Sequence, residues 1–252
     1  MPLRRTEGII LKGYPFRETS KIVVLYSPHF GKLRLVAKGA RRPKSTFGGS
    51  LEPITHVRVL FYHREGKELH TLSQADIVHP FQGLKEDLGL LGYASAACEL
   101  VLKWTPGEVP SPSLFRALLD ALREMERRGK GETLLWWFEL KAAEILGYKP
   151  ELDRCVFCGG PLKEPPLAFS PASGGVLCPC CASGDELPLS MGTARFLARL
   201  QTLPASRAAT LSAPGRTGEQ VREVIRAFLA YHTEEQGLKA LGFLHKVGEA
   251  QR

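Results

Sequence analysis

The segment Lys32-Leu-Arg-Leu-Val-Ala-Lys38 decides the fold of the N-terminal part of this chain. Leu33, Leu35 and Ala37 are apolar and occupy every second position, and the cations Lys32, Arg34 and Lys38 lie at the positions of the other parity. Successive side chains of a β-strand point to opposite faces, so the pattern predicts a strand with one apolar and one basic face. We expect the apolar face to line a core and the basic face to meet solvent.

Four further runs of aliphatic and β-branched residues flank this segment, separated by residues rich in glycine and proline. The five predicted strands are Gly8–Lys12, Lys21–Ser27, Lys32–Lys38, Ile54–Tyr62 and Glu68–Val78. On the fourth strand, His56, Arg58 and Tyr62 share a second polar face. Five short strands indicate a small barrel, and a barrel with a basic face is typical of oligonucleotide-binding (OB) folds. Tyr62 or Phe47 would then be available to stack on bases.

The positive charge of the chain is concentrated in its first third. The formal net charge is +8; residues 1–80 hold 14 Lys and Arg against 6 Asp and Glu, and residues 81–252 hold 20 of each. This asymmetry predicts a basic domain that binds nucleic acid or an anionic membrane and is attached to a neutral remainder of the chain. The alternative is a soluble domain that is basic without such a partner.

A basic loop is predicted between the third and fourth strands. Residues 39–50 contain Arg41, Arg42 and Lys44 among glycines and a proline. Such a loop can follow a phosphate backbone without reading bases, since this contact is charge neutralisation with release of counterions. The alternative is a solvated loop that is basic for solubility. The predicted nucleic-acid contacts are Lys32, Arg34, Lys38, Arg41, Arg42 and Lys44.

After Pro80 the apolar residues recur with helical periodicity. The predicted helices cover residues 84–103, 111–129, 134–146, 190–202, 219–232 and 238–247, with a linker at 203–217. Amphipathic helices of this length need each other to bury their apolar faces, so we expect a bundle. Trp136-Trp137-Phe138 cannot all face one core. One of these rings is a candidate for an interface, unless the helix is packed on two sides.

Five of the six cysteines lie in two short clusters. Cys155-Val-Phe-Cys158 is followed, after nineteen residues, by Cys178-Pro-Cys-Cys181. Two Cys-x-x-Cys turns at this separation can bring four thiolates around one zinc ion. Cys178, Cys180 and Cys181 compete for two positions, and we favour Cys178 and Cys181 because they repeat the gap of the first pair. Disulfides are the alternative, but they need an oxidising compartment.

Four thiolates would close the coordination shell, so we predict one structural zinc ion per chain rather than a catalytic one. The sequence lacks a P-loop, an HExxH motif, a GxSxG elbow and a dinucleotide fingerprint. We therefore expect no catalytic residues and no enzyme. Residues 1–7 lack the apolar core of a secretion signal, and no run is long and apolar enough to span a bilayer, so we expect a cytoplasmic protein.

These features predict an α+β architecture with three parts. Residues 1–80 form a five-stranded OB-fold barrel that binds nucleic acid. Residues 81–150 and 186–252 form an α-helical bundle domain. Residues 151–185 form a small zinc lobe with four cysteine ligands, and this lobe interrupts the helical domain.

Several short motifs follow one another in a specific order. In the first third they are Gly8-Ile-Ile-Leu-Lys12, Arg17-Glu-Thr-Ser-Lys21, Gly31-Lys-Leu, Ala37-Lys-Gly-Ala-Arg-Arg, Lys44-Ser and Gly48-Gly-Ser-Leu-Glu-Pro53. They continue with Phe169-Ser-Pro, Gly174-Gly-Val-Leu-Cys and Leu238-Lys-Ala-Leu-Gly-Phe-Leu. Together the motifs resemble the RecO family of bacterial recombination mediators over nearly the whole chain.

The resemblance implies an OB-fold domain, a helical domain and a four-cysteine zinc site. It implies a nucleoid-associated protein of DNA repair and recombination that anneals complementary single strands. With the partner RecR, such a protein promotes RecA loading on DNA coated by single-stranded DNA-binding protein (SSB), whose acidic, apolar C-terminal tail binds the helical region. Binding of double-stranded DNA is left open. Cys180 departs from the family pattern, and some members lack zinc, so the metal is not required for the family's activity.

Two other functions remain compatible with the residues. One is a zinc-dependent nucleic-acid hydrolase, and the other is a zinc-ribbon RNA-binding factor.

Overall fold

The N-terminal region of the protein is a closed five-stranded barrel. The structure is a computed structural model, and it describes residues 1–233, 238–240 and 242. The strands of the barrel are β1 (Leu3–Phe16), β2 (Ser20–Ser27), β3 (Gly31–Ala37), β4 (His56–Tyr62) and β5 (Leu69–His79), and the short 3-10 helix η1 (Gly48–Leu51) precedes β4. The strands are hydrogen-bonded in the order β1-β2-β3-β5-β4, and β4 pairs again with β1. The β3–β5 pair is parallel, and the other pairs are antiparallel. The predicted barrel is confirmed.

The alternation in β3 places its side chains as predicted. Leu33, Leu35 and Ala37 are fully buried inside the barrel, whereas Arg34 is exposed. Phe47 also belongs to this interior core and is only 8% exposed. The prediction that Phe47 is available to stack on bases is therefore wrong.

Strand β1 extends well beyond the predicted Gly8–Lys12, because it pairs with two neighbours. Its first half pairs with β4 and its second half pairs with β2, with a register shift between Ile10 and Lys12. The strand continues through Gly13 and Pro15, although such residues usually mark a turn. A residue that precedes proline favours extended backbone, which is compatible with a strand.

Helices make up most of the remaining chain. They are α1 (Gln82–Glu86), α2 (Leu88–Trp104), α3 (Pro112–Arg128), α4 (Gly131–Ile145), α5 (Met191–Thr202), α6 (Ala205–Ala208) and α7 (Arg216–Thr233). The predicted helix 84–103 is interrupted at Asp87, whose carboxylate accepts the N–H of Leu90 (2.8 Å) and caps α2. The predicted linker 203–217 contains α6, which is anchored by buried alanines. The predicted helix 238–247 lies largely outside the described residues.

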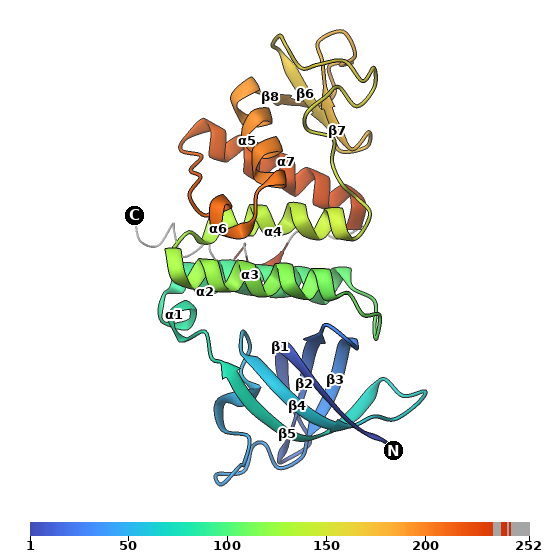
Figure 1. Ribbon diagram of the computed structural model, residues 1–252, viewed down its shortest axis with the longest axis vertical. Helices are drawn as coiled ribbons and strands as arrows, with labels where there is room; N and C mark the ends of the chain where they lie inside the picture. The colour runs from blue at the N-terminus through green and yellow to red at the C-terminus, as the bar shows by residue number, and fades with distance from the viewer. Residues whose placement is uncertain (234–237, 241, 243–252) are drawn as a thin grey trace.

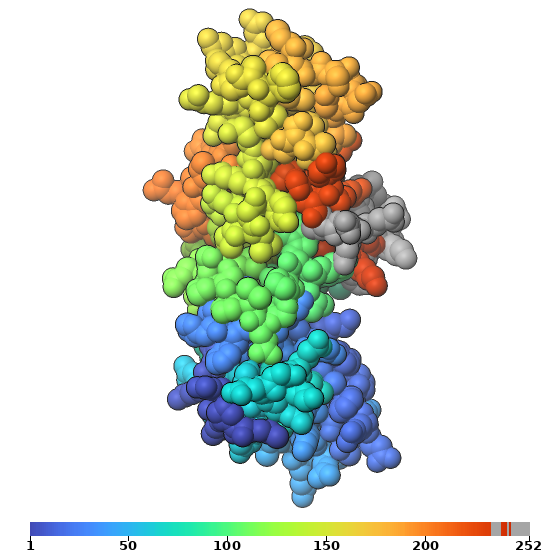
Figure 2. Space-filling model, turned by 90° about the vertical axis from the view of Figure 1, so that its right-hand side faces the viewer, coloured from blue at the N-terminus to red at the C-terminus, as the bar shows by residue number. Residues whose placement is uncertain are grey.

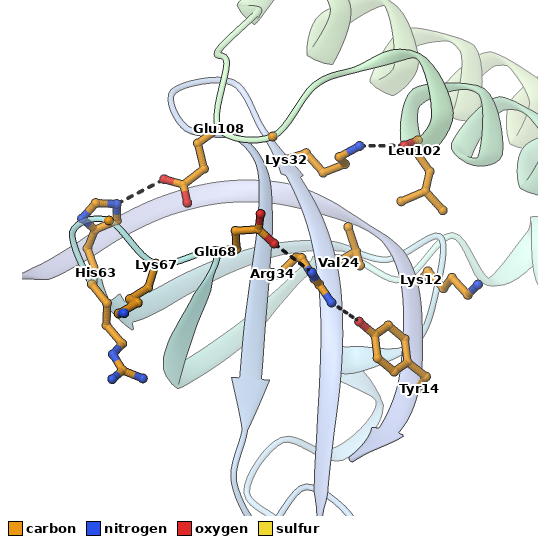
Figure 3. Close-up of a pocket in the computed structure, with 13 residues that line it drawn as sticks. Lys12, Tyr14, Val24, Lys32, Arg34, His63, Lys67, Glu68, Leu102 and Glu108 are labelled. Carbon is orange, nitrogen blue, oxygen red and sulfur yellow. Dashed lines mark hydrogen bonds and ion pairs between the residues drawn. The ribbon is translucent and has the colours of Figure 1, made fainter. Parts of the chain in front are cut away.

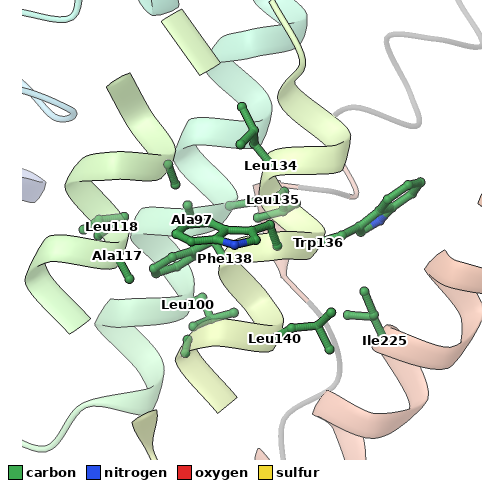
Figure 4. Close-up of a cluster of buried hydrophobic side chains, with 14 of the residues drawn as sticks. Ala97, Leu100, Ala117, Leu118, Leu134, Leu135, Trp136, Phe138, Leu140 and Ile225 are labelled. Atoms are coloured by element: carbon green, nitrogen blue, oxygen red, sulfur yellow. The ribbon is translucent and has the colours of Figure 1, made fainter. Parts of the chain in front are cut away.

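Helix α4 lies in the middle of the helical region and contacts α2, α3, α5, α6 and α7. Trp136, Trp137 and Phe138 are at most 5% exposed. Figure 4 shows Phe138 directed toward Leu118 of α3, whereas Trp136 points away from it, and the Trp136 ring packs edge-on against Phe196 of α5. The helix is thus packed on more than one side, and none of these three rings is free for an interface.

One outer side of the barrel is buried against the helices. Ile9 of β1 and Tyr26 of β2 belong to the same apolar core as α2 and α3. His56 lies at this junction, 2% exposed, with its ring edge-on to Phe115 of α3. His56 lies on the face of β4 opposite Val57, Val59 and Phe61, as the alternation predicted, but the helices cover it.

The molecule is elongated, with the barrel at one end and a small lobe at the other (Figures 1 and 2). The lobe contains a three-stranded sheet, β7-β6-β8, formed by β6 (Leu167–Ser170), β7 (Gly175–Leu177) and β8 (Leu187–Leu189). The helices lie between the lobe and the barrel. Within the part of the chain that the structure describes, none of the helices combines the length and apolar character that a membrane span needs. The domain boundaries at residues 80, 150 and 186 stay a prediction.

Candidate nucleic-acid interface and metal centre

Two cavities of about 710 and 860 Å³ open on the outer side of the barrel. The first is lined by β1, β2, β3, the β4–β5 connection and the α2–α3 connection. The second is lined by the β1–β2 turn, β3, the loop that follows it and the start of β5. Arg64 lines both cavities, so they adjoin. We call the two together the basic groove.

Cations outnumber carboxylates along the basic groove. Eight lysines and arginines line it against three glutamates, Glu18, Glu68 and Glu108. The cations are Lys12, Arg17, Lys32, Arg34, Lys38, Arg42, Arg64 and Lys67. The formal difference, eight minus three, is five positive charges in a concave surface, which attracts a polyanion such as a phosphate backbone.

The six predicted contact residues occupy different positions relative to this groove. Arg41 donates from its guanidinium to the carbonyl oxygens of Arg17 (3.3 Å) and Glu18 (3.2 Å), so it supports the β1–β2 turn. Lys44 is exposed on the loop after β3 and is not among the lining residues. The other four line the groove: Lys32, Arg34, Lys38 and Arg42.

Lys32 also joins the barrel to the helices. Its ammonium donates to the carbonyl oxygens of Leu102 (2.7 Å) and Thr105 (2.6 Å) at the C-terminal end of α2. Cations are favoured at this end of a helix because its last carbonyls are unsatisfied. Burial lowers the pKa of Lys32.

Arg34 lies in the middle of the first cavity, as Figure 3 shows. Its guanidinium donates to the Tyr14 hydroxyl oxygen (3.1 Å) and pairs with the Glu68 carboxylate (3.2 Å). The side chains of Arg34 and Glu68 are 46% and 87% exposed, and such surface pairs contribute at most about 1 kcal/mol. Arg34 can therefore exchange Glu68 for a phosphate at little cost.

Glu108 enters the same cavity from the α2–α3 connection (Figure 3). Its carboxylate accepts from Nε2 of His70 (2.6 Å) and Nε2 of His63 (3.2 Å), and the two imidazole rings stack 4.6 Å apart. Nδ1 of the fully buried His70 accepts the backbone N–H of Arg64, so the proton of this imidazole is on Nε2.

These three groups lie within 4.8 Å of one another, as metal ligands would. A metal ion would need the lone pair of His70 Nε2, which carries the proton. We therefore interpret the cluster as a hydrogen-bonded latch, the Glu108 latch, between the barrel and the α2–α3 connection.

Sequence reasoning missed four groove cations: Lys12, Arg17, Arg64 and Lys67. Three of them lie in the β1–β2 and β4–β5 connections, which flank the binding face of an OB-fold. Because the sequence already predicted an OB-fold, the cations of these two connections could have been included among the expected contacts. Tyr62, the other predicted stacking residue, is 41% exposed but is not among the groove residues.

At the other end of the molecule, the structure brings together Cys155, Cys158, Cys178 and Cys181. Their Sγ atoms all lie within 4.8 Å of one another, whereas Cys180 is exposed and outside the group. Each pair lies on a tight turn: the N–H of Gly159 donates to the Cys155 carbonyl (2.9 Å), and the N–H of Cys181 donates to the Cys178 carbonyl (3.0 Å).

The electrostatics of this thiol cluster suit a cation. Burial raises the pKa of Cys155, but N–H groups of Cys158, Cys178 and Phe157 directed at its sulfur outweigh burial and lower the pKa to about 6. The hydrogen bond with Cys178 raises the pKa of Cys181 to about 12, so Cys155 becomes a thiolate before Cys181 does. Four thiols at this spacing fit the donor set of a metal ion.

The strand order of the barrel, with β3 and β5 parallel, defines an OB-fold protein. Residues 1–81 match the family Recombination protein O N terminal, and residues 85–242 match Recombination protein O C terminal. The chain therefore belongs to the RecO family, as the sequence motifs indicated.

Two relatives illustrate how far the similarity extends. The DNA repair protein RecO of Pelotomaculum thermopropionicum is 38% identical over 252 residues, which cover 99% of this chain and 96% of that protein. The DNA repair protein RecO of Symbiobacterium thermophilum is 35% identical over 256 residues, and the similarity covers the full length of both proteins.

Proposed function

We propose that this protein binds single-stranded DNA in the basic groove and anneals complementary strands as a recombination mediator. The groove itself carries the proposal, because eight cations from five separate segments converge on one concave face of the barrel. Such a surface neutralises phosphates without reading bases, which suits a protein that must act on any sequence.

The cations have different proposed roles. Arg34, Lys38 and Arg42 line the groove and contact phosphates directly, and Lys44 extends the contact along the exposed loop. Lys32 and Arg41 hold groove segments in place through backbone carbonyls and add their charge to the same face. Charge neutralisation would let two bound strands approach each other despite their repulsion.

The proposed partners follow from family membership. With RecR, the protein would promote RecA loading on DNA coated by SSB, and the SSB tail would bind the helical region. The names of the relatives, DNA repair protein RecO, support a role in DNA repair. The cytoplasmic, nucleoid-associated location stays a prediction.

We also propose that the thiol cluster holds one structural zinc ion through Cys155, Cys158, Cys178 and Cys181. Four sulfur ligands leave no open position for water, so this zinc would stabilise the lobe rather than catalyse a reaction. The cluster lies at the end of the molecule opposite the barrel (Figure 1), which argues against a hydrolase that cuts nucleic acid in the groove with this metal.

An annealing assay on bare complementary strands tests the proposal, because SSB would add its own contact with the helical region. The groove variant carries Arg34→Ala, Lys38→Ala and Arg42→Ala. The helix variant removes the same charge from exposed positions of α5 and α7, through Arg195→Ala, Arg199→Ala and Arg226→Ala. We expect slow annealing by the groove variant alone. Equal annealing rates for the wild type and the groove variant would refute the proposal. In a separate binding competition, tighter binding of RNA than of single-stranded DNA would favour the RNA-binding alternative.

A further inference from the structure

The basic groove has an apolar floor as well as cationic walls. Tyr14 and Phe16 of β1 are both half-buried. Tyr14 lines the first cavity together with Val24, and Phe16 lines the second together with Val36. Phosphate contact is ionic and needs no such floor, so these side chains indicate that the groove receives an apolar group as well.

The strand register arranges the floor and the cations in adjacent rows. Tyr14 is opposite Ile22 of β2, which is opposite Val36 of β3. Residues directly opposite in antiparallel strands share a face of the sheet. This row is therefore aromatic at one end and aliphatic beyond it. The neighbouring row has a cation at each end and consists of Lys12, Val24 and Arg34.

Each aromatic ring has a cation beside it. The Arg34 guanidinium donates to the Tyr14 hydroxyl oxygen (3.1 Å), as Figure 3 shows, which fixes this ring at the edge of the cavity. The Arg17 guanidinium lies over the Phe16 ring, with its carbon 5.3 Å from the ring centroid, so it must move aside for a base to stack on that face. A nucleotide has a flat apolar base and an anionic phosphate, and each ring-and-cation pair matches both parts.

The spacing of the rings favours a single strand over a duplex. Two residues along a strand on the same face are about 6.6 Å apart. Stacked bases in a duplex rise only about 3.4 Å per nucleotide, and their faces are covered by their neighbours. Successive bases can contact both rings only where they are unstacked and the strand is extended.

We propose that Tyr14 and Phe16 form a two-ring stacking platform for successive bases of single-stranded DNA. This inference rests on the proposed function of the basic groove and adds base contact to phosphate contact. It gives the groove a preference for single strands that does not depend on sequence, because every base has a stacking face.

The test compares two oligonucleotides with the same backbone charge. Fluorescence anisotropy measures the binding of a labelled oligothymidine and of a fully abasic oligomer of equal length at one salt concentration. The wild type should bind the oligothymidine more tightly by a factor of roughly 25 or more, because each of the two stacked bases contributes a factor of roughly 5 or more. Tyr14→Ala and Phe16→Ala should each reduce this ratio and leave the affinity for the abasic oligomer unchanged. Tyr14→Phe keeps the ring and should keep most of the ratio.

Phe16→Leu removes the ring but retains an apolar side chain, so it replaces the alanine variant if that variant does not fold. Equal affinity of the wild type for the two oligomers, or a full ratio in both Tyr14→Ala and Phe16→Ala, would overturn the stacking platform. Salt-sensitive binding of the abasic oligomer would then still support phosphate binding by the groove. Failure of the wild type to bind either oligomer would instead refute the proposed function, and the platform with it.

Discussion

Replacement of Glu108 by glutamine should tighten DNA binding, because it removes one of the three negative charges of the basic groove. Glutamine has nearly the same shape and keeps a carbonyl oxygen that can accept the His70 hydrogen bond, which is 2.6 Å long in the wild type. A neutral hydrogen bond is roughly half as strong as a charge-assisted one, so we expect a loss of stability of about 1 kcal/mol or less.

The gain in affinity can be worked from Coulomb's law. A phosphate about 8 Å from the carboxylate, in a medium of dielectric constant about 80, is repelled by about 0.5 kcal/mol. Two such phosphates give about 1 kcal/mol, which corresponds to roughly five-fold tighter binding at low salt. The gain should fade toward 0.15 M salt, where the screening length is about 8 Å.

The assay is the anisotropy titration of a labelled oligothymidine at several salt concentrations. Glu223→Gln on the exposed surface of α7 makes the same charge change far from the groove and is the matched control. Weaker binding by a folded Glu108→Gln variant would refute the reasoning. An equal gain in the control variant would also refute it, because the effect would then be one of net charge alone.

Three further predictions concern the helices and the lobe. Cys155→Ser should lose bound zinc and lower the thermal midpoint, whereas Cys180→Ser should keep both, as metal analysis and thermal unfolding would show; full metal content in Cys155→Ser would contradict the ligand set. Burial, assisted by the charge of Glu132, raises the pKa of Glu139 from 4.5 to about 8. The folded state therefore holds a proton that the unfolded chain releases, and stability should fall between pH 4.5 and about 8 and then level off. Glu139→Gln should raise the thermal midpoint more at pH 8 than at pH 5, and an equal rise at both would exclude this origin. Phe138→Ala in the helical core should cost about 3–5 kcal/mol in urea unfolding, and a cost below about 1 kcal/mol would contradict the packing described.

The parts of the fold that the sequence predicted well are those set by local periodicity. The alternation of Leu33, Leu35 and Ala37 identified a strand and its buried face, and Ser111 and Gly129 marked the ends of α3 because capping chemistry is local. The extent of β1 was not predictable in this way, since it depends on pairing with β4, which is distant in sequence. The burial of Phe47 and His56 likewise depends on which side of the barrel the core and the helices occupy.

The candidate sites follow the same rule. The cysteine pairs have a recognisable spacing, so their four sulfurs could be named before the structure was known. The groove is assembled from separate segments, and only the cations on β3 and the following loop were apparent from sequence. Arg17 and Arg64 lie 47 positions apart and meet across one cavity because the barrel closes. Glu108 comes from the α2–α3 connection, and no local pattern indicates that it reaches the groove.

The salt dependence of DNA binding tests the central claim most directly. For single strands, each phosphate contact contributes about 0.7 to the slope of log affinity against log salt concentration. The groove variant lacks three such contacts, so its slope should be shallower than that of the wild type by about 2, with weaker binding at every salt concentration. The helix variant should keep the wild-type slope. A groove variant with the affinity and slope of the wild type would contradict the assignment of the basic groove as the DNA-binding surface.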